Sequence, residues 1–236
     1  MIIRPVSGPF RILQNPVSSG LTISGTAGIK LSASKGDYVM AKTDPIRDRK
    51  DMRRLVKYFE DKKELRNCAM VVVGYATALR ITDELNLTWE DVYDFGKQCF
   101  KIHIDVTEQK TKKQRQIRIN RAVEDILTRL MKAIRKQKGV LSPKDYIFSN
   151  GRQNGKHISR VQAWRILKKA VKELKIEGNI ACHSLRKSFG YYAWKFLNVS
   201  SNLLMSIFNH STFEVTKNYL GIDQDEKDEV YLRVIA

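Results

Sequence analysis

The sequence contains few cysteines and no long hydrophobic run. Its 3 cysteines lie far apart and show no C-x-x-C spacing, so they indicate neither a disulfide framework nor a zinc site. We read Cys68, Cys99 and Cys182 as reduced thiols of a cytoplasmic protein. The longest nearly uninterrupted apolar stretch, from Ala69 to Leu79, is well short of the roughly 18 to 20 residues that span a bilayer. We therefore expect no transmembrane segment and no membrane partner.

Acidic residues are scarce relative to basic ones. Lysine and arginine together number 43, against 25 aspartates and glutamates, which gives a formal net charge of +18. An excess of this size is more than solubility requires and indicates a polyanionic partner. Nucleic acid is the commonest such partner, an anionic membrane surface is the second, and a merely solvated basic surface is the third interpretation.

The chain divides by composition into an N-terminal appendage, a compact domain and a tail. Residues 1–40 hold three of the 5 prolines and many glycines, serines and threonines, with little helical periodicity. We expect an appendage there and no separate core-binding domain, because about 40 residues is near the lower limit for independent folding. The compact domain is expected over residues 41–222, and residues 223–236 form a tail that is first acidic and then apolar.

Apolar residues recur at helical spacing along most of the compact domain. Asp44 followed by Pro45 predicts the start of the first helix. The apolar residues of 65–79 nearly encircle a helix, which predicts a buried one, and Thr82 is expected to cap a short helix after it. Further helices are predicted over residues 123–139, 159–174, 184–197 and 200–208, followed by a last short helix that holds Tyr219.

Two stretches of the domain alternate with a period of two instead. Residues 100–106 and 116–120 each place apolar side chains at every second position, which predicts a β-hairpin with one buried face. Its tip is rich in lysine, with Lys110, Lys112 and Lys113. We therefore predict a mainly α fold with a small antiparallel β-sheet, in the α+β class.

Several residues suit chemistry on a phosphate group. His183 and Arg186 are three positions apart and share a helix face, so both can point at the same small anion. His210 precedes a helix start, where backbone N–H groups favour phosphate, and Tyr219 follows it. A lone histidine or tyrosine is more often a structural residue, but the combination with Arg80 at the end of a buried helix favours a functional site.

These residues occur in the order and at the spacing of a known family. The segment Tyr75-Ala-Thr-Ala-Leu-Arg80-Ile-Thr-Asp-Glu-Leu85 resembles the first signature box of the tyrosine recombinase, or phage integrase, family. His183-Ser-Leu-Arg186 looks like the family's H-x-x-R, and His210 is similar to the histidine of its G-H-S-S segment. Tyr219 falls at the spacing of the nucleophile. Lys110-Thr111 is the best match to the active-site lysine of the hairpin turn, with Lys112 as the second choice.

The resemblance implies the tyrosine recombinase catalytic-domain fold and a site-specific enzyme that cuts and rejoins double-stranded DNA through a 3′-phosphotyrosyl intermediate. Tyr219 would be the nucleophile, and two arginines would clamp the phosphate because guanidinium groups are permanently charged and bidentate. His183 would be the candidate base and His210 a hydrogen-bond donor, while Lys110 would protonate the leaving 5′-hydroxyl. No cofactor and no metal ion is implied. A bacterial or phage-encoded protein of a mobile element is expected.

Some positions depart from the family pattern. Asn209 stands where the family usually has glycine, and Lys187 replaces a frequent histidine or arginine. The larger departure is the expected absence of the family's separate core-binding domain. Without that domain we expect a requirement for a helper protein, a shorter target or reduced affinity. Self-association on DNA is expected, and residues 223–236 are a candidate contact between protomers.

Basic residues crowd the predicted hairpin and the catalytic segments. Those predicted to contact DNA are Lys112, Lys113, Arg115, Arg118 and Lys187. Two other functions stay open. A regulator with the recombinase fold would bind its sites without exchanging strands, and an enzyme like a type IB topoisomerase would relax DNA without a specific site.

Overall fold

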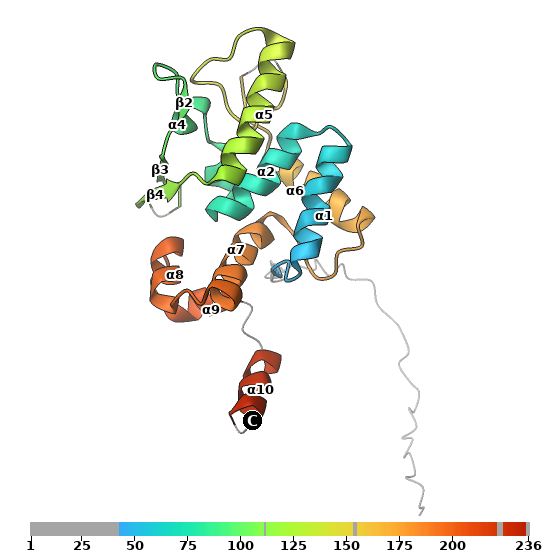
Figure 1. Cartoon of the computed structure of the whole chain (residues 1–236), viewed down its shortest axis with the longest axis vertical. Coiled ribbons are helices and arrows are strands. Elements are labelled where there is room, and N and C mark those ends of the chain that lie inside the picture. Colours follow the sequence, from blue (N-terminus) through green and yellow to red (C-terminus); the bar gives the residue numbers. More distant parts are fainter. Residues whose placement is uncertain (1–42, 111, 153–154, 221–223, 235–236) are drawn as a thin grey trace, which may run out of the picture. The chain divides into compact units, whose positions relative to one another are not determined.

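The computed structural model describes residues 43–110, 112–152, 155–220 and 224–234, so the predicted appendage 1–40 lies outside the described residues. The described part is mostly helical with two small antiparallel two-stranded sheets, which confirms the predicted fold class (Figure 1). The helices are α1 (Arg49–Asp61), α2 (Leu65–Thr77), α3 (Ile81–Leu85), α4 (Trp89–Val92), α5 (Arg121–Lys138), α6 (Arg160–Glu173), α7 (Cys182–Leu197), α8 (Ser201–Phe208), α9 (Phe213–Leu220) and α10 (Gln224–Arg233). The strands are β1 (Tyr93–Asp94), β2 (Cys99–Phe100), β3 (His103–Thr107) and β4 (Gln114–Arg118).

Helix α2 is the centre of the main hydrophobic core. It packs against α1, α5 and α7, and Figure 1 shows it between α1 and α5. Its residues Cys68, Ala69, Met70, Val71 and Val73 are all buried. A helix with neighbours on several sides needs apolar residues all round, which explains the sequence pattern of this segment.

A second, smaller core forms where α7, α8 and α9 meet. Ala193 of α7, Leu204 and Phe208 of α8 and Leu220 of α9 are buried together with Ala78, the residue that follows α2. This cluster supports the helices that carry His183 and Tyr219 and that flank His210.

The helix termini were predictable where the cap is local. Asn120, Ser159 and Ser200 each accept a hydrogen bond from the backbone N–H three residues later, which satisfies one free donor of α5, α6 and α8. Gly139 ends α5 with φ of +76°, a conformation that favours glycine.

The predicted start of the first helix at Asp44 is wrong. Helix α1 begins at Arg49, and its N-cap is Asp48, whose side chain accepts from the Lys50 N–H at 2.7 Å. Asp44 instead accepts from the backbone N–H of Asn179 at 2.8 Å. The segment before α1 therefore bonds to a distant part of the chain, and no local pattern could reveal that contact.

The cap of the short helix after α2 also differs from the prediction. Arg80, and not Thr82, is the N-cap residue of α3, and it makes no side-chain capping bond. The side chain of Arg80 is consequently free to point away from the helix that it precedes.

Strands β3 and β4 form the predicted hairpin with altered limits. Ile104 pairs with Ile117, and both are buried. Phe100 belongs to β2, which pairs with β1, and Ile102 between them is 61% exposed. The alternation over residues 100–106 therefore spans two different strands, because the chain crosses from one sheet to the other within it.

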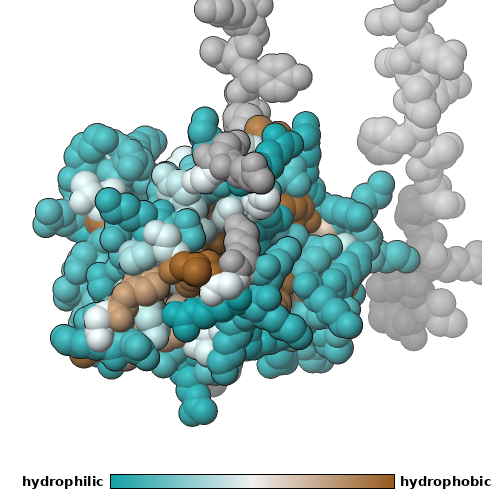
Figure 2. Space-filling view, turned by 90° about the horizontal axis from the view of Figure 1, so that it is seen from above, coloured by the Kyte–Doolittle hydropathy of each residue, from teal (hydrophilic) through white to brown (hydrophobic). Residues whose placement is uncertain are grey.

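The face of the molecule in Figure 2 is largely hydrophilic, with hydrophobic residues in small patches. No helix in the part of the chain that the structure describes is both long and apolar enough to span a membrane.

Gly190 on α7 marks the closest approach of α7 to α8 and α9. A Cβ atom at this position would lie 2.9 Å from Cζ of Phe208 and 3.2 Å from the carbonyl oxygen of Tyr219. Only a residue without a side chain fits there without displacing the ring or the backbone.

We predict that Gly190→Ala lowers the free energy of unfolding by about 1 to 3 kcal/mol, because overpacking forces neighbouring groups apart. Denaturant unfolding measures the change. Gly96→Ala is the matched control, since its Cβ would meet only Oδ1 of Asp94, at 3.4 Å. Equal stability of the two variants would contradict the close packing of α7 on α8 and α9.

Candidate active site

Arg186 on α7 is fully buried and bonds to the ends of two other helices. Its guanidinium Nη1 donates to the carbonyl oxygen of Ala78, just beyond α2. Nη2 donates to the carbonyl oxygen of Phe208, the last residue of α8, at 2.8 Å. The C-terminal carbonyls of a helix lack partners within the helix and carry partial negative charge, so a cation is favoured there. Burial lowers the pKa of Arg186 to about 10, which leaves it charged at neutral pH.

Tyr219 lies in the last turn of α9, surrounded by the side chains that the sequence predicted. Its ring centroid lies 4.5 Å from that of His210 and 5.0 Å from that of His183. Cζ of Arg186 lies 5.7 Å from the same centroid. Four of the six predicted catalytic residues therefore converge, from α7, α9 and the turn before α9.

His210 is held in place by α8 and α9. Its Nδ1 lies 3.0 Å from Oγ1 of Thr216, a buried residue of α9, and its ring stacks on Phe208 with centroids 5.2 Å apart. Thr216 is a residue of the site that the sequence analysis missed. The spacing of six positions between the two residues gives no helical signal, because His210 lies outside α9.

Both histidines of the site are neutral at pH 7. Burial lowers the pKa of His183 to about 4, with a further contribution from the charge of Arg186. The pKa of His210 is also lowered to about 4, first by burial and then by Arg186. A neutral imidazole has one nitrogen that accepts a proton and one that donates, so either ring can take part in proton transfer or hydrogen bonding.

Arg80 joins the same site from the junction of α2 and α3. Its charge is among those that lower the pKa values of His183, His210 and Arg186. Its Nη1 forms an ion pair with Oε2 of Glu108 at 2.5 Å, and the side chain keeps 18% of its surface exposed. Arg80 is thus the member of the cluster with a charged side chain still open to an incoming anion.

The hairpin places its lysines at the surface. Lys110, Lys112 and Lys113 are exposed at the end of the hairpin, and Arg118 is exposed on β4. Lys110 and Lys112 lie in the same turn, so the choice between them as the active-site lysine stays a prediction. The backbone N–H of Gln109 donates to Oδ1 of Asp83 at 2.9 Å, which ties this turn to α3.

Two residues that were predicted to contact DNA point inward. The Arg115 side chain is 8% exposed, and its Nη1 lies 3.3 Å from Oε1 of Glu108. Lys187 is 4% exposed, donates to the carbonyl oxygen of Thr43 and lies 5.9 Å from the ring centroid of Tyr219. Their burial comes from tertiary packing, and contact of either residue with DNA stays a prediction.

Glu108 and Asp83 are site residues that the sequence analysis missed. Glu108 is the one acidic residue in the basic stretch of residues 106–118, and that isolation is a signal that could have drawn attention to it. Asp83 lies three positions after Arg80 in the first turn of α3, where a carboxylate has an ordinary explanation.

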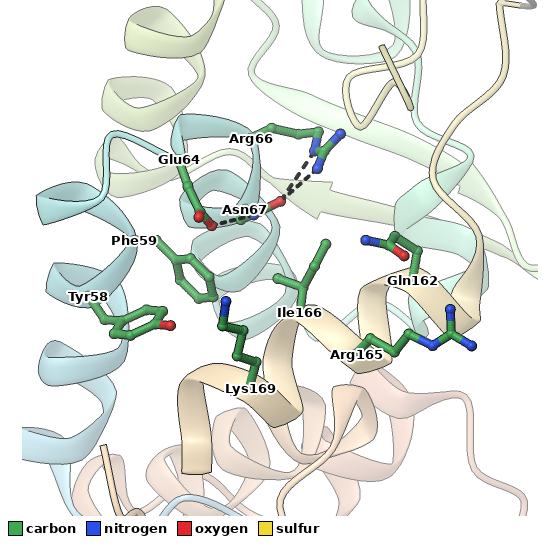
Figure 3. Close-up of a pocket in the computed structure, with 9 residues that line it drawn as sticks. All are labelled: Tyr58, Phe59, Glu64, Arg66, Asn67, Gln162, Arg165, Ile166 and Lys169. Atoms are coloured by element: carbon green, nitrogen blue, oxygen red, sulfur yellow. Dashed lines mark hydrogen bonds between the residues drawn. The ribbon is translucent and has the colours of Figure 1, made fainter. Parts of the chain in front are cut away.

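A pocket of about 300 Å³ lies elsewhere, between α1, α2 and α6 (Figure 3). Arg66, Asn67 and Glu64 form a hydrogen-bonded chain along one wall, and Arg165 and Lys169 come from α6. None of the predicted catalytic residues lines it. Within the described ranges, no group of three or more histidine, cysteine, aspartate or glutamate residues is arranged to hold a metal ion.

Comparison with known proteins agrees with this geometry. A family model described as the phage integrase family matches residues 47–226. The chain belongs to this family. The probable integrase/recombinase YoeC of Bacillus subtilis is 33% identical over 187 residues, which cover 79% of this chain and 94% of that protein. Tyrosine recombinase XerD of Listeria monocytogenes is 28% identical over 174 residues and 71% of this chain, but the match spans only 54% of XerD.

Solved structures of recombinases show the same fold. XerA recombinase superposes with a TM-score of 0.62 at 19% identity, over 79% of this chain and 63% of that one. XerH recombinase bound to its palindromic difH substrate superposes with a TM-score of 0.64 at 15% identity, over 83% of this chain and 55% of that one. The predicted family and catalytic-domain fold are therefore confirmed, whereas the roles of the individual residues stay predictions.

The lowered histidine pKa values predict how stability depends on pH. An unfolded histidine titrates near 6.5 and the folded ones near 4, so the unfolded chain binds more protons between these values. Stability is therefore full above about pH 6.5 and falls as the pH drops toward 4. His210→Asn should remove part of this loss, on the order of 1 to 3 kcal/mol, in denaturant unfolding at pH 7 and pH 4.5. Identical pH dependence in the variant and the wild type would contradict a half-buried, neutral His210.

Proposed function

We propose that this chain cuts and rejoins double-stranded DNA as a site-specific tyrosine recombinase, with Tyr219 as the nucleophile. The observation that carries the proposal is the convergence of the Tyr219 ring with His183, His210 and Arg186, with centroids 4.5 to 5.0 Å from the two imidazoles. The phenol is a weak nucleophile at neutral pH, and these are the groups that would activate it and stabilise the charge on a phosphodiester.

The cleavage step follows from the positions of these groups. The Tyr219 oxygen attacks phosphorus, the bond to the 5′ oxygen breaks, and a 3′-phosphotyrosyl bond forms. Neutral His183 accepts the phenol proton, and His210 donates a hydrogen bond to the phosphate. The 5′ oxygen leaves with a proton from Lys110. Attack by a 5′-hydroxyl on the phosphotyrosyl bond reverses the step, so DNA is rejoined without a cofactor or metal ion.

The two arginines contribute differently to this scheme. Arg80, with its partly exposed side chain, contacts a non-bridging oxygen of the phosphate directly. Arg186 supplies its charge from beneath Tyr219, where a low dielectric strengthens the interaction. Direct contact between Arg186 and the phosphate requires the groups that cover the guanidinium to move, because Arg186 is fully buried in this structure.

DNA is the proposed polyanionic partner. The exposed Lys110, Lys112, Lys113 and Arg118 of the hairpin would bind phosphates, and such binding weakens steeply with salt. The related XerH structure contains its difH substrate, and the related structure of the Tn1549 transposon integrase is a complex with DNA. We extend to this chain the DNA partner named there, together with self-association on DNA and help from an accessory protein.

Covalent capture tests the proposed function. The protein is incubated with fragmented DNA from its source, denatured with detergent, and the linked fragments are sequenced. We expect one enriched sequence joined through a 3′-phosphate to Tyr219. Tyr219→Phe should abolish capture without changing DNA affinity, and Tyr231→Phe, on the exposed surface of α10, is the matched control.

Other outcomes of the same experiment identify the alternatives. Diverse captured sequences would indicate an activity like that of a type IB topoisomerase. DNA binding by both proteins without any capture, also in the presence of added host factors, would contradict strand exchange and favour a DNA-binding regulator.

A further inference from the structure

Glu108 is a completely buried carboxylate that lies between two arginines. Its Oε2 pairs with Nη1 of Arg80 at 2.5 Å, and its Oε1 pairs with Nη1 of Arg115 at 3.3 Å. The exposed fraction of Glu108 is 0%, so it cannot touch DNA in this conformation. Glu108 can therefore affect cleavage only through the groups that it contacts, such as Arg80 and Arg115.

The backbone of Glu108 is fixed as firmly as its side chain. Its N–H donates to the carbonyl of Lys113 at 3.0 Å, and its carbonyl accepts from the N–H of Lys112 at 2.8 Å. These two bonds close the end of the hairpin. One residue therefore connects the hairpin turn to the arginine at the start of α3.

The ion pair also orients Arg80. Its Nη1 atom is buried on the side of Glu108, so the 18% of the side chain that is exposed belongs to its other atoms. A guanidinium gripped at one nitrogen keeps its remaining N–H groups pointing the opposite way, since the group is planar and rigid. The ion pair thus restricts the directions in which the other N–H groups of Arg80 can point before any phosphate arrives.

Stability alone is a poor reason for this arrangement. Desolvating a carboxylate and two guanidiniums is costly, and well-packed apolar residues often stabilise a protein as much as a buried ion pair does. A buried pair that orients a reacting group has a functional reason to be present.

We propose that Glu108 is a positioning residue for DNA cleavage, which holds the Arg80 guanidinium so that its free edge meets the non-bridging oxygen of the phosphate. This inference rests on the proposed function. It assigns no direct contact with the substrate to Glu108, and it gives Arg115 the role of a second anchor for the same carboxylate.

The test compares cleavage of two DNA substrates by Glu108→Gln, Arg80→Gln and the wild type. One substrate has an ordinary phosphodiester at the cleaved position, and the other has a methylphosphonate, which lacks one charged non-bridging oxygen. Asp105→Asn is the matched control, because it removes a carboxylate from the exposed face of the same hairpin, where Gln116 is its partner.

We expect Glu108→Gln to slow formation of the covalent complex about 10- to 100-fold on the phosphodiester. Displacement of a reacting group by about 1 Å has an effect of this size. On the methylphosphonate the defect should shrink in parallel with that of Arg80→Gln, because the charge that Arg80 meets is gone. Asp105→Asn should match the wild type on both substrates.

Three results would overturn the proposal. The first is a wild-type rate for Glu108→Gln on the phosphodiester, and the second is the same defect on both substrates, which would indicate a general loss of structure. The third comes from an additional substrate with a 5′-phosphorothiolate at the cleaved position, whose thiolate leaving group needs no proton. Rescue of Glu108→Gln on this substrate would show that the effect acts through Lys110. Failure of the wild type on every substrate would instead contradict the proposed function. In that case, a double-mutant cycle still tests whether Glu108 and Arg80 interact, using the unfolding free energies of Glu108→Gln, Arg80→Gln and the double variant. Additive changes in these free energies would overturn the proposed contact between the two residues.

Discussion

The arrangement of the site depends on one buried cation. Arg186 donates to the carbonyls that end α2 and α8, so a single guanidinium satisfies acceptors that two helices cannot satisfy themselves. The chain turns away from both helix ends through residues in the left-handed conformation. Ala78 is itself the bonded residue after α2, and Asn209 directly follows the bonded Phe208 of α8. Arg186 thereby fixes where the chain leaves α2 toward Arg80 and where it leaves α8 toward His210.

The electrostatic character of the site follows from the same burial. Two guanidiniums near two imidazoles in a water-poor environment keep both histidines neutral, and His183 is thereby ready to accept a proton. Glu108 compensates the charge at the other end of the cluster by pairing with Arg80 and Arg115.

The sequence predicted those features that depend on local pattern or on the order of motifs. The helices α5 and α6 and the hairpin follow from the spacing of apolar residues. The convergence of His183, Arg186, His210 and Tyr219 follows from resemblance to a family. The start of α1 was misplaced because Asp44 bonds to Asn179, far away in the chain. The inward direction of Arg115 and Lys187 and the role of Glu108 depend on tertiary contacts, which a net charge or a periodicity does not encode.

Hydrogen exchange tests whether Arg186 holds the ends of α2 and α8 and so assembles the site. Backbone amide exchange is compared between the wild type, Arg186→Gln and Arg165→Gln, which removes an exposed arginine of α6. We expect faster exchange in Arg186→Gln over residues 75–80 and 205–220, with α5 unchanged, and no change in Arg165→Gln. Unchanged exchange in those two segments, or an equal rise along the whole chain, would contradict it.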